Sequence, residues 1–273
     1  MPALPLSPQV FSILSALIEE RSGLHYSPVD QALFAEKVTP RLEENGFDSF
    51  LDYYYFLRYD EGGAQEMTRL IETLVVNETY LFRELEQLRV AVGSLIEPLV
   101  RAGRRPRIWS AACASGEEPA TLAMLLADRG LLDRCELIAS DISAAVLARA
   151  REGRFSRRAL RSLNPALAEK WLIQRGNEAD LSPRLLAAID FRQINLIDAA
   201  AVNAVGKLDV ILCRNVLIYF RDELIKQVIE RFAHMLVPGG ALLVSVSESL
   251  LRFGTSLQCE EHGGAFVYRR SAR

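Results

Sequence analysis

The sequence predicts an α/β domain, in which helices wrap a parallel sheet, preceded by a small all-helical domain. From residue 107 onwards, strand-like and helix-like runs alternate, as they do in proteins with a parallel sheet. In the first 75 residues, apolar residues recur at the spacing of amphipathic helices. A chain of 273 residues is long enough for one large domain and a small one.

Composition and charge exclude several classes of protein. The net charge of −3 gives no general basic field, so we expect no nucleic-acid partner. No apolar stretch approaches the ~20 residues of a membrane span, and the start of the chain lacks the pattern of a signal peptide. The four cysteines and three histidines are scattered, which predicts reduced thiols in the cytoplasm and no metal site.

The all-helical domain is expected over residues 1–75. Ser7 and Pro8 suit the start of its first helix, and Asp48 or Ser49 suits the cap of the third. The apolar spacing predicts four helices, at residues 11–24, 31–46, 48–60 and 64–76. Residues 76–106 are expected to form a linker and a connecting helix.

The α/β domain is expected over residues 107–273. Its strands are predicted at residues 107–114, 135–142, 189–196, 207–215, 240–248 and 265–270. Its helices are predicted at residues 117–130, 143–153 and 222–236. Ligands of such sheets bind beyond the carboxyl ends of the strands, so polar residues there are candidates for a binding site.

An insertion interrupts the alternation at residues 155–193. Residues 170–174 and the short segment after them suit a small antiparallel hairpin. Insertions on a rigid scaffold often recognise a partner. A plain structural excursion would explain the same residues.

The turn after the first strand of the sheet places Gly116, Glu117 and Glu118 at the candidate site. Small residues here let the backbone approach a ligand closely, but the GxGxxG phosphate fingerprint is absent. Acidic side chains argue against an anionic phosphate and for a ligand with positive charge. Alternatively, both glutamates only favour the amino terminus of the next helix.

Three further strand ends carry polar residues. Asp141 ends the second strand, where an acidic residue commonly binds the ribose of NAD or of S-adenosylmethionine, or else caps the next helix. Asn195 ends the third strand. Cys213, Arg214 and Asn215 end the fourth, and a buried Arg214 needs a partner, for which a neighbouring carboxylate would suffice.

A last cluster precedes the sheet. Asn77, Glu78, Thr79 and Arg83 interrupt an apolar run, and their position relative to the binding edge does not follow from periodicity. A helix cap at Asn77 or Thr79 would explain them equally.

In this order and spacing, the clusters resemble the chemotaxis-receptor methyltransferases, the CheR family. The matching stretches are NETYLFRE, WSAACASGEEPATLAM, ASDIS, the INL of IDFRQINL, DVILCRNVLIYF, LVPGGALLVSVSESL and the closing VYRR. The resemblance covers essentially the whole chain. It implies a Rossmann-like S-adenosylmethionine-dependent methyltransferase domain with a small antiparallel β insertion, preceded by an all-α N-terminal domain.

The resemblance also implies an activity and a partner. Such an enzyme is cytoplasmic and is a protein-glutamate O-methyltransferase. It uses S-adenosyl-L-methionine, releases S-adenosyl-L-homocysteine, and forms γ-glutamyl methyl esters on the cytoplasmic helical bundle of methyl-accepting chemoreceptors. We expect a monomer, with no membrane insertion and no metal.

Residue roles carry over by motif. Arg83 and Tyr219 are expected to line the methyl-transfer site. Asp141 is expected to bind the ribose hydroxyls, and Glu117 to face the methionine end of the cofactor. The full set of expected cofactor contacts is Asn77, Thr79, Arg83, Glu117, Asp141, Asn195, Leu196, Cys213 and Arg214.

Two departures from the family bear on substrate docking. In the family, the helix predicted here at residues 31–46 is thought to approach the acidic receptor bundle. Here it is less basic, with Lys37 and Arg41 beside three glutamates, which predicts weaker docking. The hairpin around residues 174–183 looks shorter than in members that bind a receptor's C-terminal pentapeptide, which favours an enzyme that does not need that pentapeptide.

Other functions remain open from the sequence. One is a methyltransferase of the same fold that acts on another protein or a small molecule. Another is a cofactor-binding module that regulates a complex without turnover, although the intact Arg83 and Tyr219 argue against it. A dehydrogenase would need phosphate-cradling glycines, which residues 112–119 lack.

Overall fold

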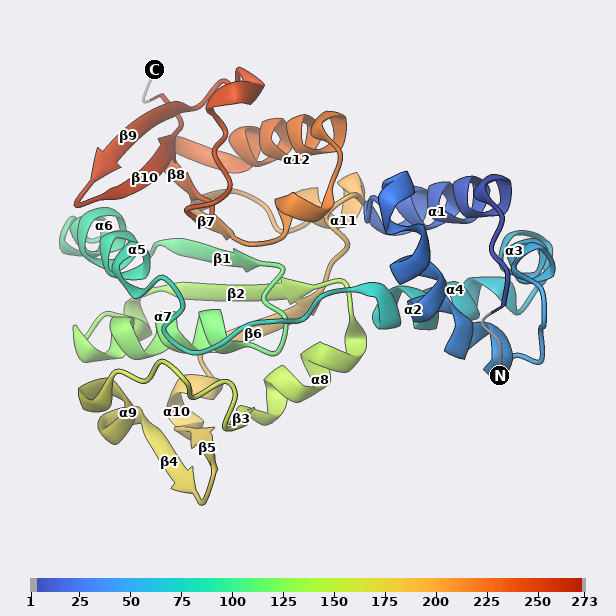
Figure 1. Cartoon of the computed structure of the whole chain (residues 1–273). Helices are drawn as coiled ribbons and strands as arrows, with labels where there is room; N and C mark the ends of the chain where they lie inside the picture. Colours follow the sequence, from blue (N-terminus) through green and yellow to red (C-terminus); the bar gives the residue numbers. More distant parts are fainter. Residues whose placement is uncertain (1–3, 272–273) are drawn as a thin grey trace. The chain divides into compact units, whose positions relative to one another are not determined.

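The structure is a computed structural model that describes residues 4–271 and divides into two compact units (Figure 1). The first unit extends to Val76 and also takes in Tyr219–Arg221. The second begins at Asn77 and contains the rest of the chain. The predicted domain limits at residues 1 and 273 lie outside the described residues.

The first unit is all-helical, as predicted. Its helices are α1 Pro8–Ser22, α2 Gln31–Glu44, α3 Phe50–Tyr59 and α4 Gly63–Leu74, with a 3-10 turn at Pro28–Asp30. Ser7 caps α1 by accepting a hydrogen bond from the Val10 N–H at 3.3 Å. Of the two candidates for α3, Ser49 is the cap, because its hydroxyl accepts the N–H of Asp52.

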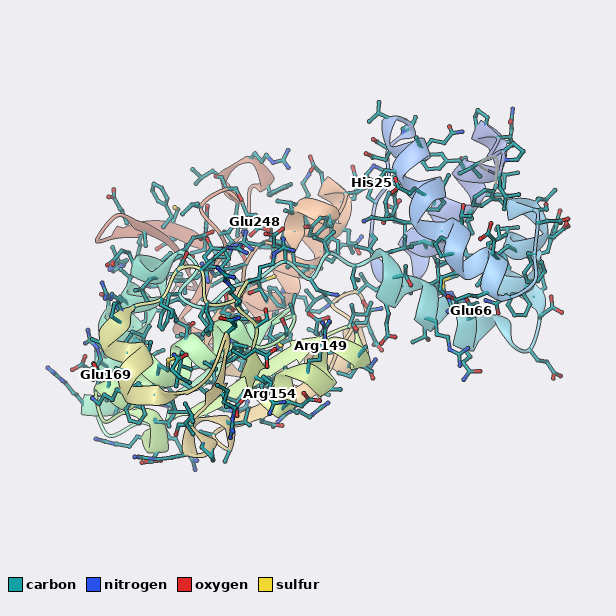
Figure 2. All side chains as sticks on the ribbon, turned by 60° about the horizontal axis from the view of Figure 1, so that its bottom comes forward. His25, Glu66, Arg149, Arg154, Glu169 and Glu248 are labelled. Carbon is teal, nitrogen blue, oxygen red and sulfur yellow. The ribbon has the colours of Figure 1, made fainter. Side chains whose placement is uncertain are left out.

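A buried ionic cluster lies within the first unit. Glu66 of α4, labelled in Figure 2, is buried, and its Oε1 accepts hydrogen bonds from the Tyr53 hydroxyl at 2.7 Å and from Arg41 Nε at 2.9 Å. Arg41 also pairs with Glu44. One of the two positive charges of α2 is therefore neutralised inside its own unit.

The second unit is built on a seven-stranded sheet with the order β6-β2-β1-β7-β8-β10-β9. The strands are β1 Arg107–Ala111, β2 Glu136–Asp141, β6 Ile189–Gln193, β7 Leu208–Cys213, β8 Leu236–Leu243, β9 Gln258–His262 and β10 Ala265–Arg269. Neighbouring strands from β6 to β8 are parallel, whereas β10 is antiparallel to both β8 and β9.

Two features of this sheet differ from the prediction. Edge strand β9 was not predicted, because its mostly exposed and polar residues lack an apolar alternation. β8 begins at Leu236, four residues earlier than expected, and ends at Leu243 rather than at Glu248. The chain leaves the sheet there, and Glu248 becomes part of a loop.

Helices cover both faces of the sheet. They are α5 Leu85–Val90, a π-helical turn Ala91–Ile96, α6 Glu97–Arg101, α7 Glu117–Asp128, α8 Ala144–Glu152, α11 Ala199–Asn203 and α12 Asp222–Met235. Trp109 of β1 packs edge-on against Phe232 of α12 at 5.4 Å between ring centroids. Its neighbour Ile108 joins the core with Leu88 and Leu122 on the opposite face, as the alternation of a strand requires.

The insertion forms a separate three-stranded antiparallel sheet of order β3-β5-β4. It contains β3 Arg154–Phe155, α9 Pro165–Trp171, β4 Leu172–Arg175, β5 Glu178–Leu181 and α10 Pro183–Leu186. The predicted antiparallel hairpin is confirmed as β4 and β5. Among residues 4–271, no helix is both long and apolar enough to cross a membrane.

Candidate functional site

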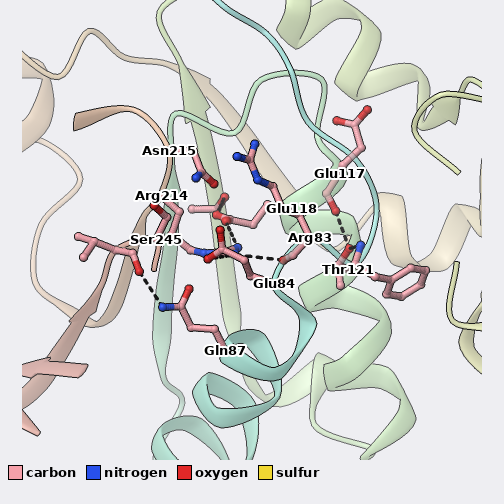
Figure 3. Close-up of polar contacts among 12 residues, drawn as sticks. Arg83, Glu84, Gln87, Glu117, Glu118, Thr121, Arg214, Asn215 and Ser245 are labelled. Carbon is pink, nitrogen blue, oxygen red and sulfur yellow. Dashed lines mark hydrogen bonds and ion pairs between the residues drawn. The ribbon is translucent and has the colours of Figure 1, made fainter. Parts of the chain in front are cut away.

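The candidate site lies where β1, β2, β6 and β7 end. Parallel strands bring their carboxyl ends to one edge, and this edge carries the four polar clusters that the sequence places after the strands. The segment 77–84 reaches the same edge, because Arg83 and Glu84 contact Arg214 directly (Figure 3). The structure therefore brings together five clusters that are far apart in the sequence.

Strained backbone is concentrated at this edge. Among the described residues, all five non-glycine residues with positive φ lie in its loops: Phe82 at 64°, Glu84 at 49°, Ala112 at 61°, Ala114 at 47° and Asn215 at 61°. Such conformations are unfavourable by roughly 1 kcal/mol or more each and persist where the surrounding structure holds them. This clustering supports a functional role for the edge.

Arg214 makes a buried ion-pair network. Its side chain is 2% exposed; Nη1 donates to Glu118 at 2.6 Å, and Nη2 lies 3.0 Å from both a Glu84 carboxylate oxygen and the Arg83 carbonyl (Figure 3). Glu118 also accepts a hydrogen bond from Ser110. For Arg214 and Glu118 the structural ion pair considered from the sequence is thus the observed arrangement, and a cofactor contact by Arg214 stays a prediction.

Asp141 ties two turns together. Its carboxylate is buried and accepts hydrogen bonds from the Ala114 N–H at 2.9 Å and the Ser143 N–H at 3.0 Å. Burial raises the pKa of Asp141 more than these hydrogen bonds lower it. Ser143 caps α8, so Asp141 is not the helix cap.

Glu117 is a buried carboxylate without an ion-pair partner among the described residues. It is 4% exposed, and its carboxylate accepts a hydrogen bond from the Ser115 hydroxyl at 2.8 Å. It makes no ion pair with any residue between 4 and 271. Burial raises the pKa of Glu117 above its ordinary value. A buried acid in this state suits the positive charge of a ligand.

The segment before α5 holds the remaining predicted residues of the amino-terminal cluster. Asn77 and Thr79 are half-buried, and the helix after them begins only at Leu85, so neither caps it. Arg83 is half-buried; its Nη1 donates to the Glu78 carbonyl at 3.0 Å, and its Cζ lies 5.7 Å from the centre of the Tyr80 ring.

The other predicted contacts differ in accessibility. Asn195 is half-buried and Leu196 is buried. Cys213 is 0% exposed, so its thiol does not reach the surface of the site, whereas the next but one residue, Asn215, is half-buried. Tyr219 lies in a 3-10 turn, Leu217–Tyr219, and is grouped with the first unit, so its pairing with Arg83 stays a prediction.

Sequence reasoning missed Glu248. This buried carboxylate accepts hydrogen bonds from the N–H groups of Asn215 at 2.7 Å, Ser245 at 3.0 Å and Ile218 at 3.3 Å. It therefore holds the loop after β7 to the loop after β8. The only sequence signal is an acidic residue in a stretch that reads as a strand, and that pattern gives no reason to place it in a loop.

Comparison with known proteins agrees with this architecture. Residues 9–75 match the family described as CheR methyltransferase, all-alpha domain, and residues 77–263 match CheR methyltransferase, SAM binding domain. The fold and these matches define an S-adenosylmethionine-dependent methyltransferase with an all-α domain before its SAM-binding domain. The chain belongs to the CheR methyltransferase family.

Several relatives are similar over most of this chain. Chemotaxis protein methyltransferase 2 of Vibrio cholerae is 34% identical, over 86% of this chain and 84% of the relative. Chemotaxis protein methyltransferase of Vibrio parahaemolyticus is 34% identical, over 98% of this chain and 99% of the relative. A probable biofilm formation methyltransferase of Pseudomonas aeruginosa, WspC, is 30% identical over 94% of this chain and 61% of the relative.

Proposed function

We propose that the protein methylates glutamate side chains of a methyl-accepting chemoreceptor. The γ-carboxylate takes the methyl group of S-adenosylmethionine, giving a γ-glutamyl methyl ester and S-adenosylhomocysteine. The observation that carries this assignment is that the site contains a half-buried Arg83 and that its strand-end loops contain no histidine. These loops are residues 112–116, 142–143, 194–196 and 214–215. The names of the chemotaxis relatives support the same substrate.

The residues at the edge fit the cofactor. The buried Glu117, which makes no ion pair within residues 4–271, suits the ammonium group of its methionine part, and Asp141 has carboxylate oxygens for the ribose hydroxyls. Bound S-adenosylmethionine supplies a methyl group on a positively charged sulfur. Since the Cys213 thiol is buried, we propose that this strand end contacts the cofactor through its backbone and through Asn215.

A carboxylate substrate explains the missing base. A glutamate has an ordinary pKa near ~4.3 and is already ionised at neutral pH, so no group needs to remove a proton. The protein has to align the carboxylate oxygen with the methyl group and remove water from it. We propose that Arg83 orients the incoming carboxylate by a charge-assisted hydrogen bond and that Tyr219 lines the same site.

The chemical nature of the product tests this function. The protein is incubated with methyl-labelled S-adenosylmethionine and membranes that contain a chemoreceptor from the same cell, and the labelled protein is then treated with alkali. Label released as volatile methanol is expected, because carboxyl methyl esters hydrolyse. Label that stays on the protein would indicate a nitrogen or other acceptor. Absence of label despite tight cofactor binding would favour a different receptor partner or a binding module that regulates without turnover.

A further inference from the structure

A dense group of exposed arginines lies beside the candidate site. Between residues 149 and 161 the chain carries six arginines and one glutamate, a net charge of +5 in a protein whose total is −3. We call these six residues the arginine surface; they are exposed and run from the end of α8 to the loop before α9: Arg149, Arg151, Arg154, Arg157, Arg158 and Arg161. Figure 2 labels Arg149 and Arg154.

Some of these arginines serve the fold. Arg154 pairs with Asp180 of β5 at 3.0 Å, and Arg151 donates to the Phe191 carbonyl at 2.9 Å. Arg157 differs, because it has no ion-pair partner among residues 4–271. The loop beyond β3 therefore carries positive charge that the described part of the chain leaves available.

Arg158 and Arg161 share one carboxylate. Both lie close to the same oxygen of Glu78, at 3.1 and 3.2 Å, and the Arg161 guanidinium is 3.9 Å from the centre of the Tyr80 ring. The Arg158 side chain is 72% exposed and that of Glu78 is 51% exposed. Ion pairs this exposed contribute little to stability, so an external carboxylate can replace Glu78.

This arginine pair is next to Arg83. The Arg83 guanidinium donates to the backbone carbonyl of the same Glu78, and the N–H of Leu81 donates to the carbonyl of Ala159 at 2.9 Å. The backbone contact fixes the arginine surface to the segment that carries Arg83. A chain whose glutamate reaches Arg83 will bring its neighbouring residues near these arginines.

Helix α2 does not supply an equivalent surface. Arg41 is engaged with Glu66 and Glu44, and Lys37 stands beside Glu36 on a helix with more acidic than basic residues. This helix, which the sequence shows to be less basic than in the family, therefore has little free positive charge, whereas residues 149–161 carry a clear excess.

We propose that the arginine surface binds acidic side chains of the substrate helix near the methylated glutamate, and that Glu78 is an internal competitor displaced by them. The partner named here rests on the proposed function. A carboxylate is the favoured ligand because Glu78 already occupies the arginine pair. A negatively charged chain with one local patch lacks the broad basic field that nucleic acid needs.

Removal of two arginines tests the surface. In the double variant Arg157→Ala/Arg158→Ala, KM for receptor-containing membranes is expected to rise about 10-fold at ~0.05 M salt and about 2-fold at ~0.5 M salt, with kcat unchanged. The matched control is Arg101→Ala/Arg184→Ala, which removes two exposed arginines elsewhere in the second unit and is expected to change KM less than 2-fold. Equal effects of both double variants would overturn the proposal.

Substitution of Glu78 distinguishes competition with the substrate from a purely structural role of this residue. If Glu78 competes with the substrate, Glu78→Gln frees Arg158 and Arg161, and KM is expected to fall about 3-fold at low salt. If Glu78 only organises the loop, the same variant will raise KM or leave it unchanged, and the competitor assignment is then wrong. Unchanged affinity for S-adenosylhomocysteine, measured by calorimetry, establishes that the variants are folded.

A direct binding measurement separates this inference from the proposed function. The probe is a fluorescein-labelled synthetic helical peptide with glutamates along one face, and anionic phospholipid vesicles are the comparison. Peptide binding that is lost in Arg157→Ala/Arg158→Ala and kept in the control supports the surface, even if no receptor becomes methylated. Equal peptide binding by both variants, or arginine-dependent binding to the vesicles in preference to the peptide, overturns it.

Discussion

The surroundings of the Glu117 carboxylate favour the ligand-bound protein over the ligand-free protein. Its side chain is buried, and Ser115 supplies a hydroxyl but no positive charge. A buried acid of this kind destabilises the folded chain at neutral pH, and a cationic group in the site removes that penalty. The same residue can therefore weaken the free protein and strengthen the complex.

Replacing Glu117 by glutamine is expected to separate these two effects. Without the charge, affinity for S-adenosylhomocysteine should fall about 10- to 100-fold, because one charge-assisted contact is lost. The free energy of unfolding of the ligand-free protein should rise by on the order of 1 kcal/mol. Calorimetry and thermal melting measure the two quantities, and unchanged affinity would remove Glu117 from the site.

The raised pKa of Glu117 predicts a pH dependence of cofactor binding. Its pKa in the folded, ligand-free protein lies above the unfolded value, so its contribution to stability is complete at low pH and is lost as pH rises through the raised pKa. A bound cation reverses this preference. Cofactor affinity should therefore weaken as pH falls through the raised pKa, with a proton released on binding. Calorimetry in buffers of different ionisation enthalpy detects that proton, and Glu117→Gln should release less of it.

Arg83 is expected to act on turnover more than on cofactor binding. Arg83→Ala should reduce kcat about 100-fold, because the incoming carboxylate loses the group that orients it, while affinity for S-adenosylhomocysteine stays within several-fold. Arg89→Ala is the control, since Arg89 is exposed on α5 and pairs only with Glu86 among described residues. Wild-type turnover of Arg83→Ala would contradict the assigned role.

At the scale of elements, the loops that form the edge are held by carboxylates that bind backbone N–H groups. Asp141 joins the turn after β1 to the end of β2, and Glu248 joins the loops after β7 and β8. These bonds keep strained residues such as Asn215 in place. The strands set where the loops begin, and the carboxylates set the paths that the loops follow.

Loss of the Glu248 charge should therefore destabilise the loops at the carboxyl ends of the strands. Glu248→Gln replaces one acceptor oxygen by an NH2 group that faces backbone donors, so the free energy of unfolding is expected to fall by about 2 kcal/mol. Turnover should fall with it. Thermal melting gives the first quantity, and Glu230→Gln, which alters a half-buried carboxylate that binds Ser256, is the control with a smaller expected loss.

How far the sequence predicts the structure depends on the kind of signal. Alternation and apolar spacing located the main elements of the α/β unit and the four helices of the first, because burial of one face dictates those patterns. The polar residues after each apolar strand located the carboxyl-end edge of the sheet, because they mark where burial of the strand stops. β9 is an exposed edge strand whose residues are free to be polar, so it carries no such pattern.

The partners of the site residues could not be predicted. Arg214 pairs with Glu118, almost a hundred positions away, and with Glu84 in a strained segment before the sheet. Periodicity describes which face a residue occupies, whereas an ion pair depends on how several loops close around one another. Residue roles came instead from the family resemblance, and the contacts with the cofactor remain predictions.

At the scale of the whole molecule, the two units can be observed separately. Both tryptophans, Trp109 and Trp171, belong to the second unit, and the first contains none. Tryptophan fluorescence therefore reports on the unit that carries the candidate cofactor site.

Ligand binding should raise the melting temperature seen by tryptophan fluorescence. S-adenosylhomocysteine at ~100 times its Kd stabilises the folded state by about 2.7 kcal/mol, which corresponds to roughly 5 to 10 °C for a unit of this size. Asp141→Ala, with weakened ribose binding, should show a smaller shift at the same concentration. A wild-type protein whose transition does not move would argue against a cofactor site in the second unit.

The π-helical turn Ala91–Ile96 has a consequence for comparing relatives. A π turn holds one residue more than an α-helical turn, so deleting one residue here leaves an α-helical turn and keeps the residues on either side on the same faces of the helix. Deleting a residue from the α-helical turns beside it would instead rotate everything before it by about 100° around the helix axis, and Gln87, which donates to the Val244 carbonyl at 2.7 Å, and the buried Leu88 would leave their positions. In an alignment with a relative one residue shorter in this region, the gap therefore belongs inside this π turn rather than in the flanking helical turns.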